Sequence, residues 1–191
     1  MLEHIIPSKT RRKTLELFFH HPHENYYLRR VVRDVDEEVN AVKRELDILE
    51  NAKVLTKERR LNKVFYRINK SYIYYDEFLR MFSKTTFLAT EIYKNISKIG
   101  KIKFIVLSIR YIKQQPIKSD EIYLLIVGTV VTPEVSSIVS QAEKTFIQEI
   151  NFTVMNEDEF NFRKRNNDPF IWRFLKQAKV ILIGTEEELM K

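Results

Sequence analysis

Apolar residues in the first 70 positions recur at helical spacing in three short stretches. Leu15, Phe18 and Phe19 lie three and four residues apart, which predicts a helix over residues 8–20 with Ser8 as its cap and Pro22 as its stop. A second helix is expected over 28–34, and a third after the acidic bend at 36–38. Their core-facing residues are expected to be Leu28, Val31, Val32 and Val35, then Ala41, Val42, Leu46 and Leu49.

After the third helix the pattern changes to that of a β-hairpin. Residues 54–58 and 64–68 are rich in β-branched and aromatic side chains, and a polar tip at 59–63 separates them. Three helices followed by a hairpin with a basic tip is the element order of a winged helix. In this variant of helix-turn-helix the third helix enters the major groove of DNA.

The rest of the chain has a different rhythm. Dense apolar spacing over 72–97 predicts one or two connecting helices, with a break near residues 84–86. Strands are expected at 102–109, 121–127, 150–154 and 180–183, with helices at 133–148 and 157–175, and this alternation implies a small α/β sheet. We therefore expect an α+β protein with an N-terminal domain (1–70), a helical connector (71–98) and a C-terminal α/β domain (99–191).

Composition excludes several classes of site. The chain has no cysteine, so disulfides and cysteine-ligated metal centres are ruled out. Its three glycines, Gly100, Gly128 and Gly184, are too few and too scattered for a P-loop or a dinucleotide-binding fingerprint. No apolar run approaches the length of a membrane span or a signal peptide, so we expect a soluble cytoplasmic protein without membrane contact.

Charge favours a polyanionic partner. The net charge of the chain is +7, and residues 1–70 hold 16 Lys and Arg against 11 Asp and Glu, a balance of +5. Most of the excess charge thus lies where the helices and the hairpin are expected. We expect this part to bind double-stranded DNA.

The residues of the second and third helices resemble those of a known family. The runs 27–35, 38–46 and 49–55, with the strand 64–69, resemble prokaryotic winged-helix regulators of the broad ArsR-like type. The resemblance covers nearly the whole N-terminal domain, and it implies that residues 38–46 belong to the recognition helix. One departure is Lys53, which occupies the position of a helix-ending glycine. We therefore expect this helix to end without the left-handed conformation that glycine adopts easily.

The candidate DNA contacts divide into two groups. On the third helix, Asn40, Lys43 and Arg44 lie opposite the apolar stripe, where they can read base edges. On the second helix and the hairpin, Arg29, Arg30, Arg59, Arg60 and Lys63 can neutralise phosphates without conveying sequence. An ordinary solvated surface is the alternative for both groups. The same holds for the basic cluster at residues 9–13, whose alternative role is to balance charge within the fold.

The C-terminal domain resembles nucleotidyltransferase-type domains. The resemblance rests on residues 123–128, 149–154, 157–160, 168–170 and 180–184. It also implies Gly-Ser after the first strand and Asp-x-Asp on the second, because two metal ions need several carboxylate oxygens. Here Leu107 and Ser108 replace Gly-Ser, Tyr123 and Leu125 replace the aspartates, and Asn151 lies near the expected third carboxylate. We expect a noncatalytic domain without a cofactor.

Two further groups invite a functional reading. His20, His21, His23 and Glu24 are of metal-ligand type, and so is the pair Asp120 and Glu121, but neither spacing suits one ion and we expect no metal site. The aromatic set 72–87 is typical of a core or a subunit interface.

Three functions follow from these patterns. The first is a sequence-specific DNA-binding transcription regulator, expected to be a homodimer, whose C-terminal domain senses an unknown small ligand or assembles subunits. The second is a divergent metal-dependent nucleotidyltransferase targeted by its winged helix. The third is a winged-helix protein–protein adaptor, which predicts no salt-dependent affinity for DNA.

Overall fold

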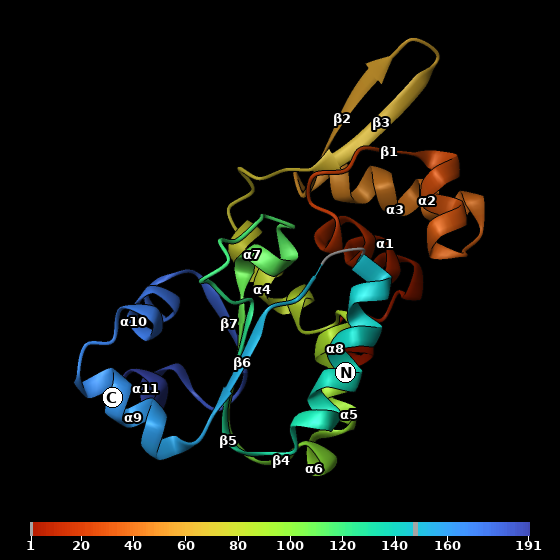
Figure 1. The fold of residues 1–191 in the computed structure, drawn as a ribbon. Helices are drawn as coiled ribbons and strands as arrows, with labels where there is room; N and C mark the ends of the chain where they lie inside the picture. Colours follow the sequence, from red (N-terminus) through yellow and green to blue (C-terminus); the bar gives the residue numbers. More distant parts are fainter. Residues whose placement is uncertain (1, 147–148) are drawn as a thin grey trace. The chain divides into compact units, whose positions relative to one another are not determined.

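The chain folds into two compact α/β units. The computed structural model describes residues 2–146 and 149–191, and divides into Met1–Phe82 and Ser83–Lys191. The division falls inside the range 71–98 that was predicted for the domain boundary. Each unit has its own buried core, and the two are described separately below. Figure 1 shows their helices and strands.

Unit 1 begins with the helices that the apolar periodicity predicts. A short 3-10 turn, η1 (Leu2–His4), precedes α1 (Lys9–His20), α2 (Leu28–Val35) and α3 (Val39–Asn51). Ser8 caps α1 by accepting a hydrogen bond from the Arg11 amide, and Glu38 caps α3 through the amides of Asn40 and Ala41. Of the predicted core residues, Val31, Val35, Val42, Leu46 and Leu49 are buried, while Leu28, Val32 and Ala41 are partly exposed.

The hairpin of unit 1 is longer than predicted. Strands β2 (Leu55–Arg60) and β3 (Lys63–Ile68) pair antiparallel, and β1 (Tyr26–Tyr27), which the sequence did not predict, pairs with β3 to give the order β1-β3-β2. The predicted five-residue tip is therefore reduced to a two-residue turn at Leu61 and Asn62. Arg59, Arg60 and Lys63 lie on the strands, because the ladder continues to the pair Arg60 and Lys63.

The end of α3 corrects the expectation for Lys53. Lys53 has a φ of +64°, so the chain keeps the left-handed conformation and places a lysine in it. Flanking hydrogen bonds hold this turn. The side-chain amide of Asn69 donates to the Lys53 carbonyl over 2.8 Å, and the Val54 amide donates to the Leu49 carbonyl.

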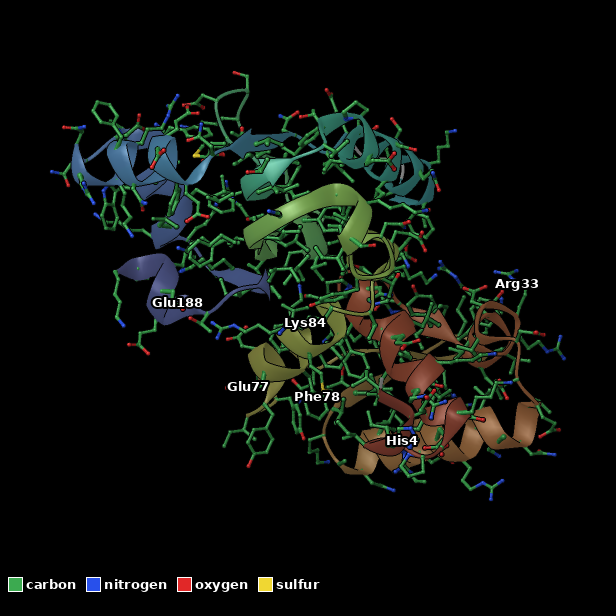
Figure 2. All side chains as sticks on the ribbon, turned by 90° about the horizontal axis from the view of Figure 1, so that it is seen from below. His4, Arg33, Glu77, Phe78, Lys84 and Glu188 are labelled. Carbon is green, nitrogen blue, oxygen red and sulfur yellow. The ribbon has the colours of Figure 1, made fainter. Side chains whose placement is uncertain are left out.

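The predicted connector is not a separate part of the fold. Helix α4 (Tyr75–Ser83) packs in unit 1, where Phe19 of α1 lies 5.2 Å from Phe82 and 5.7 Å from Phe78 between ring centroids. Figure 2 labels Phe78 on this helix. Helices α5 (Phe87–Lys94) and α6 (Ile96–Ile99) belong to unit 2, and the break predicted at 84–86 separates them from α4. Of the predicted aromatic set, Tyr75 and Phe82 are buried in the core and Tyr74 is exposed. The remaining members, Tyr72, Phe78 and Phe87, are partly exposed.

Unit 2 is built on a four-stranded mixed sheet. Its strands are β4 (Gly100–Ser108), β5 (Leu124–Val130), β6 (Phe152–Met155) and β7 (Lys179–Ile183), in the order β6-β5-β4-β7. Strand β4 is antiparallel to β5 and β7, and β5 is parallel to β6. The strand predicted from residue 121 begins instead at Leu124.

Helices cover both faces of this sheet (Figure 1). Alternating residues of β5 point to opposite faces. Leu125 and Val127 join a core with α9 (Glu157–Arg165), α10 (Pro169–Lys176) and α11 (Glu186–Met190), and α5, α6 and α8 (Thr132–Phe146) cover the other face. The helix predicted at 157–175 is divided, because Asp168 caps a new helix that starts at Pro169. Residues 147–148 of the helix predicted at 133–148 lie outside the described residues, and the short α7 (Ile109–Ile112) and α11 were not predicted.

In the part of the chain that the structure describes, no helix has both the length and the apolar character needed to span a membrane.

Candidate nucleic-acid interface

A basic groove lies between the start of α2, the exposed face of α3 and the hairpin. Its volume is about 560 Å³, and it receives one cation from each of these elements: Arg29, Lys43 and Lys63. The remaining lining residues are Tyr27, Leu28, Asn62, Val64 and Tyr66. This lining contains no carboxylate, so the groove presents positive charge against partly aromatic walls.

Strand β1 places the groove's cations opposite one another. Tyr27 pairs with Phe65 on the neighbouring strand, and α2 begins at the next residue, so the start of α2 is fixed beside the hairpin. The Lys63 ammonium lies 4.6 Å from the centroid of the Tyr27 ring, a cation–π contact that steers it toward the groove. A two-residue strand thus joins two basic elements that are 34 positions apart in sequence.

The outward face of α3 carries the residues predicted to read bases. Asn40, Lys43 and Arg44 are all exposed, and they lie opposite the buried Val42 and Leu46. Asn40 is the most constrained of the three, because its side-chain amide donates to Glu38 over 3.4 Å. Lys43 and Arg44 have no ion-pair partner within the described residues. The helical period therefore brings these three side chains together as predicted.

Glu45 fixes which face of α3 turns outward. Only 8% of this glutamate is exposed, and its carboxylate accepts hydrogen bonds from the Ser8 hydroxyl at 2.8 Å and from Arg11 Nε at 2.7 Å. A buried charge needs such partners to offset its desolvation. The contact therefore ties the middle of α3 to the start of α1, a role that the sequence analysis missed.

Two of the predicted phosphate contacts are already engaged within unit 1. Arg30 pairs with Glu24 at 2.6 Å and with Asp34 at 3.4 Å, and its guanidinium lies 4.5 Å from the Tyr26 ring centroid. Arg60 forms a two-point contact with Glu58, through Nε at 2.9 Å and through its second nitrogen at 2.8 Å. Burial opposes the charge of Arg30, but the contacts with Glu24 and Asp34 outweigh it and raise its pKa, and the bonds to Glu58 raise the pKa of Arg60.

Arg29 and Arg59 differ from these two. Both are exposed, and neither has a carboxylate partner among residues 2–146 and 149–191. Of the eight residues predicted to contact DNA, Arg29, Lys43, Arg44, Arg59 and Lys63 are therefore the cations whose charge is open to a ligand, and we call these five the open cations.

The basic cluster at residues 9–13 has an internal role. Lys9 and Lys13 form ion pairs with Glu37 at 2.9 and 2.8 Å, and the two ammonium groups, Lys13 more than Lys9, lower the pKa of the Glu37 carboxyl. Lys13 also donates to the Val35 carbonyl over 2.8 Å. Arg12 donates to the Ile6 carbonyl at 2.6 Å. We call the contacts of Lys9 and Lys13 with the turn between α2 and α3 the α1 clamp.

The histidines near residue 20 do not form a metal centre among the described residues, where no group of three or more potential ligands converges. His20 Nε2 donates to the Phe82 carbonyl at 2.9 Å. Burial lowers the pKa of His20 to about 4, so the ring is neutral near pH 7. His23 contacts the ammonium of Lys70 at 3.2 Å instead.

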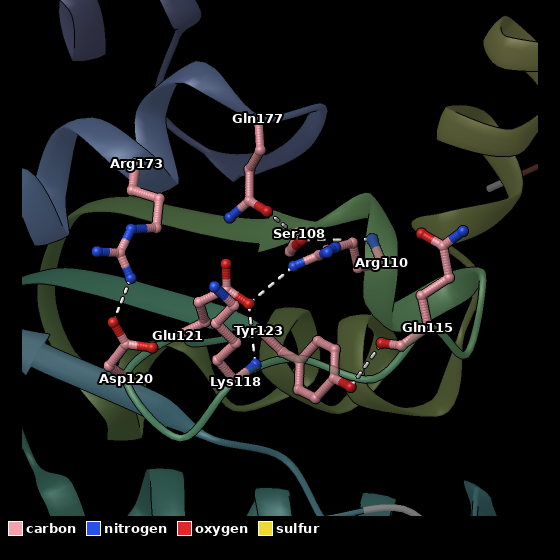
Figure 3. Close-up of polar contacts among 9 residues, drawn as sticks. All are labelled: Ser108, Arg110, Gln115, Lys118, Asp120, Glu121, Tyr123, Arg173 and Gln177. Atoms are coloured by element: carbon pink, nitrogen blue, oxygen red, sulfur yellow. Dashed lines mark hydrogen bonds and ion pairs between the residues drawn. The ribbon is translucent and has the colours of Figure 1, made fainter.

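In unit 2, the positions compared with a nucleotidyltransferase site do converge at one end of the sheet. The Ser108 amide donates to the Tyr123 carbonyl at 2.7 Å, and the Tyr123 amide donates to the Asn151 carbonyl at 2.8 Å. Ser108 is buried and caps α7, and the Tyr123 hydroxyl donates to the Gln115 carbonyl (Figure 3). Leu125 is fully buried in the core.

Asp120 and Glu121 each bind a different arginine. Asp120 is hydrogen-bonded to Arg173, which lowers the pKa of its carboxyl, while Glu121 accepts from Arg110 at 2.8 Å and from the Lys118 amide at 2.9 Å (Figure 3). The two carboxylates lie in the loop before β5 rather than on a strand. Each carboxylate is therefore paired with a different arginine.

A second hollow of about 680 Å³ opens beside this loop, between α8 and the start of β6. Its lining is polar and acidic, and includes Ser136, Ser140, Glu143, Asn151 and Thr153. Glu143 is partly engaged, because it accepts a hydrogen bond from the Ile150 amide at 2.8 Å. Asp120 and Glu121 also line this hollow, and both are engaged by arginines.

Comparisons with protein-family models, with curated proteins and with solved structures give no match to this chain, so its function is inferred from its own residues.

Proposed function

We propose that the protein is a sequence-specific transcription regulator, and that unit 1 is a winged helix-turn-helix that binds double-stranded DNA. The observation that carries this proposal is the basic groove, in which α2, α3 and the hairpin each contribute a cation and no carboxylate intervenes. Helix α3 is the recognition helix in this proposal, and β2 and β3 form the wing. This order of elements is the one that places a third helix in the major groove.

The exposed residues divide by role along this surface. Asn40 and Arg44 lie on the outward face of α3, where an amide can pair with adenine and a guanidinium with guanine. Arg29, Lys43 and Lys63 line the groove, and Arg59 precedes Arg60 on β2. We assign these four to phosphates, Lys43 in place of the base contact predicted for it. Because Arg30 and Arg60 are held by carboxylates, their contribution is expected to be smaller than that of the open cations.

Selection of binding sites from random duplexes, followed by titration, tests the proposal. The full chain should enrich one motif and bind it with an affinity that falls steeply with salt. Lys43→Ala and Arg29→Ala should each weaken binding. Arg33→Ala is the matched control, because Arg33 lies on α2 outside the groove and pairs with Asp34 at 3.0 Å (Figure 2). An absence of enrichment and of salt-dependent affinity would refute DNA binding and leave the adaptor function.

For unit 2 we propose a noncatalytic, nucleotidyltransferase-like domain that senses a small ligand or assembles subunits. Its support is the chemistry at the end of the sheet, where Tyr123 and Leu125 are buried at the positions that would carry aspartates. Neither side chain can hold Mg²⁺. Incubation with nucleoside triphosphates, Mg²⁺ or Mn²⁺ and candidate acceptors should give no transfer. Turnover lost in Asp120→Ala or Glu121→Ala would instead establish the enzyme.

We further propose that the regulator acts as a homodimer, because a single recognition helix reads only a short site. The predicted interface was the aromatic stripe, but Tyr75, Leu79 and Phe82 are buried within unit 1. Tyr74 is the member of that set open to a second copy, and the neighbouring Ile73 is exposed beside it in sequence. Light scattering at micromolar concentration, with and without DNA, should give a dimer, and a monomer under both conditions would refute it.

A further inference from the structure

The hairpin ends in a leucine that no local interaction explains. Leu61 is 95% exposed, more than any other large hydrophobic residue among those that the structure describes. It also has a φ of +51°, a conformation that glycine and asparagine adopt far more easily than leucine. The next residue is Asn62, so the chain places the apolar residue, rather than the asparagine, at the left-handed position.

The residues around Leu61 are arranged for contact with a polyanion. Arg60 and Lys63 lie directly opposite each other in the ladder, and Arg59 lies one position further from the turn at Leu61 and Asn62. Like charges across a strand pair repel, and Glu58 offsets this only on the Arg60 side. An anion seated between the strands would relieve the repulsion. An apolar side chain thus stands at the apex of a cationic hairpin.

The hairpin also has the length to reach the base pairs. All residues from Lys57 to Val64 are exposed, and we call this segment the hairpin tip. Its four residues on β2 extend by about 13 Å, at about 3.3 Å per residue. The minor groove of B-DNA is about 7.5 Å deep, so a side chain at the apex can touch base edges while the cations further back meet phosphates.

We propose that Leu61 is a wedge that enters the minor groove and partly unstacks one base step, and this rests on the proposed DNA binding by unit 1. Leucine is among the apolar side chains that suit this role, and insertion removes its exposed surface from water. The favoured step is a flexible pyrimidine–purine step, which unstacks at the least cost. The hairpin tip would thereby select sequence through deformability, at a position separate from the bases read by α3.

The test uses the full chain and duplexes containing the selected motif, with 2-aminopurine placed at successive steps beyond it. Wild-type protein should raise the fluorescence at one step, because unstacking removes the quenching. Leu61→Gly removes the side chain and suits the positive φ, so it should abolish the rise and weaken binding about tenfold, the scale of burying one leucine. Leu61→Met keeps an apolar wedge and should retain both. Ile5→Thr removes exposed apolar surface from unit 1 outside the groove and should leave both unchanged.

The outcomes separate the wedge from the proposed function. If wild-type protein binds the motif, and Leu61→Gly binds it as tightly with the same fluorescence, the wedge is refuted and DNA binding stands. Loss of the fluorescence rise in Leu61→Met would also refute an apolar wedge. If wild-type protein binds no duplex, the proposed function fails and the wedge with it. Thermal melting of each variant verifies that unit 1 stays folded.

Discussion

Replacing Lys53 with glycine is expected to stabilise unit 1. The left-handed conformation costs a residue with a Cβ about 1 to 2 kcal/mol, and Lys53 adopts it at φ +64°. Glycine avoids this cost but loses about 0.5 to 1 kcal/mol through the greater freedom of the unfolded chain. The net gain should therefore be about 0.5 to 1 kcal/mol. The turn itself should persist, because the Asn69 amide bonds the Lys53 carbonyl and not its side chain.

Thermal and urea unfolding of the full chain measure this gain. At about 4 to 8 °C per kcal/mol for a domain of this size, the melting temperature of the transition of unit 1 should rise by about 2 to 8 °C. Lys53→Ala is the control, because alanine removes the charge and keeps the Cβ. Alanine should give no gain. If glycine and alanine stabilise equally, the effect comes from the removed charge, and the argument from backbone strain is wrong.

Three further predictions concern unit 1. Arg44→Ala should reduce the binding free energy by about 1 to 3 kcal/mol on the selected DNA and by little on scrambled DNA. Arg59→Ala should weaken binding to both duplexes alike, and should reduce the slope of log affinity against log salt concentration by about one unit. Titrations at several salt concentrations distinguish the two variants. The pKa of His20 is about 4 in the folded chain and 6.5 in the unfolded chain, so the unfolded chain binds the proton more tightly. The free energy of unfolding should therefore fall as the pH drops from 6.5 to 4, by up to about 3 kcal/mol relative to His20→Gln. Denaturant titrations of both proteins at several pH values measure the difference. Glu45→Gln keeps the shape of the side chain but loses the charged contact with Arg11. Because the Arg11 side chain is 38% exposed, the free energy of unfolding should fall by only about 1 kcal/mol in chemical unfolding. An unchanged free energy would show that the charged contact is not needed.

The helices of unit 1 could be predicted because their signals are local. Burial of Val42, Leu46 and Leu49 follows from a period of 3.6 residues, and the same period turns Asn40 and Arg44 outward. The caps of α1 and α3 are equally local. The division at Asp168 and Pro169 was also marked in the sequence, since an aspartate followed by proline is a strong helix start.

Other features depend on contacts between distant residues and could not be predicted in the same way. Nothing near Tyr26 indicates that it pairs with Tyr66, since two residues are too few for a period. A glutamate on a helix is normally assigned to solvent, so the burial of Glu45 needs knowledge of Ser8 and Arg11. Which arginines lack a carboxylate partner is likewise set by neighbours that only the fold provides.

The α1 clamp bears on how fast and how tightly the surface can bind. A partner that must first order a flexible turn loses affinity, because part of the binding free energy is spent on restricting the chain. Here Lys9 and Lys13 hold Glu37, and Lys13 also bonds the Val35 carbonyl, so the angle between α2 and α3 is set before any encounter. Lys9 and Lys13 therefore make the surface rigid rather than bind the partner themselves. Association should resemble the docking of a rigid body, and mutations in the α1 clamp should slow association rather than speed dissociation.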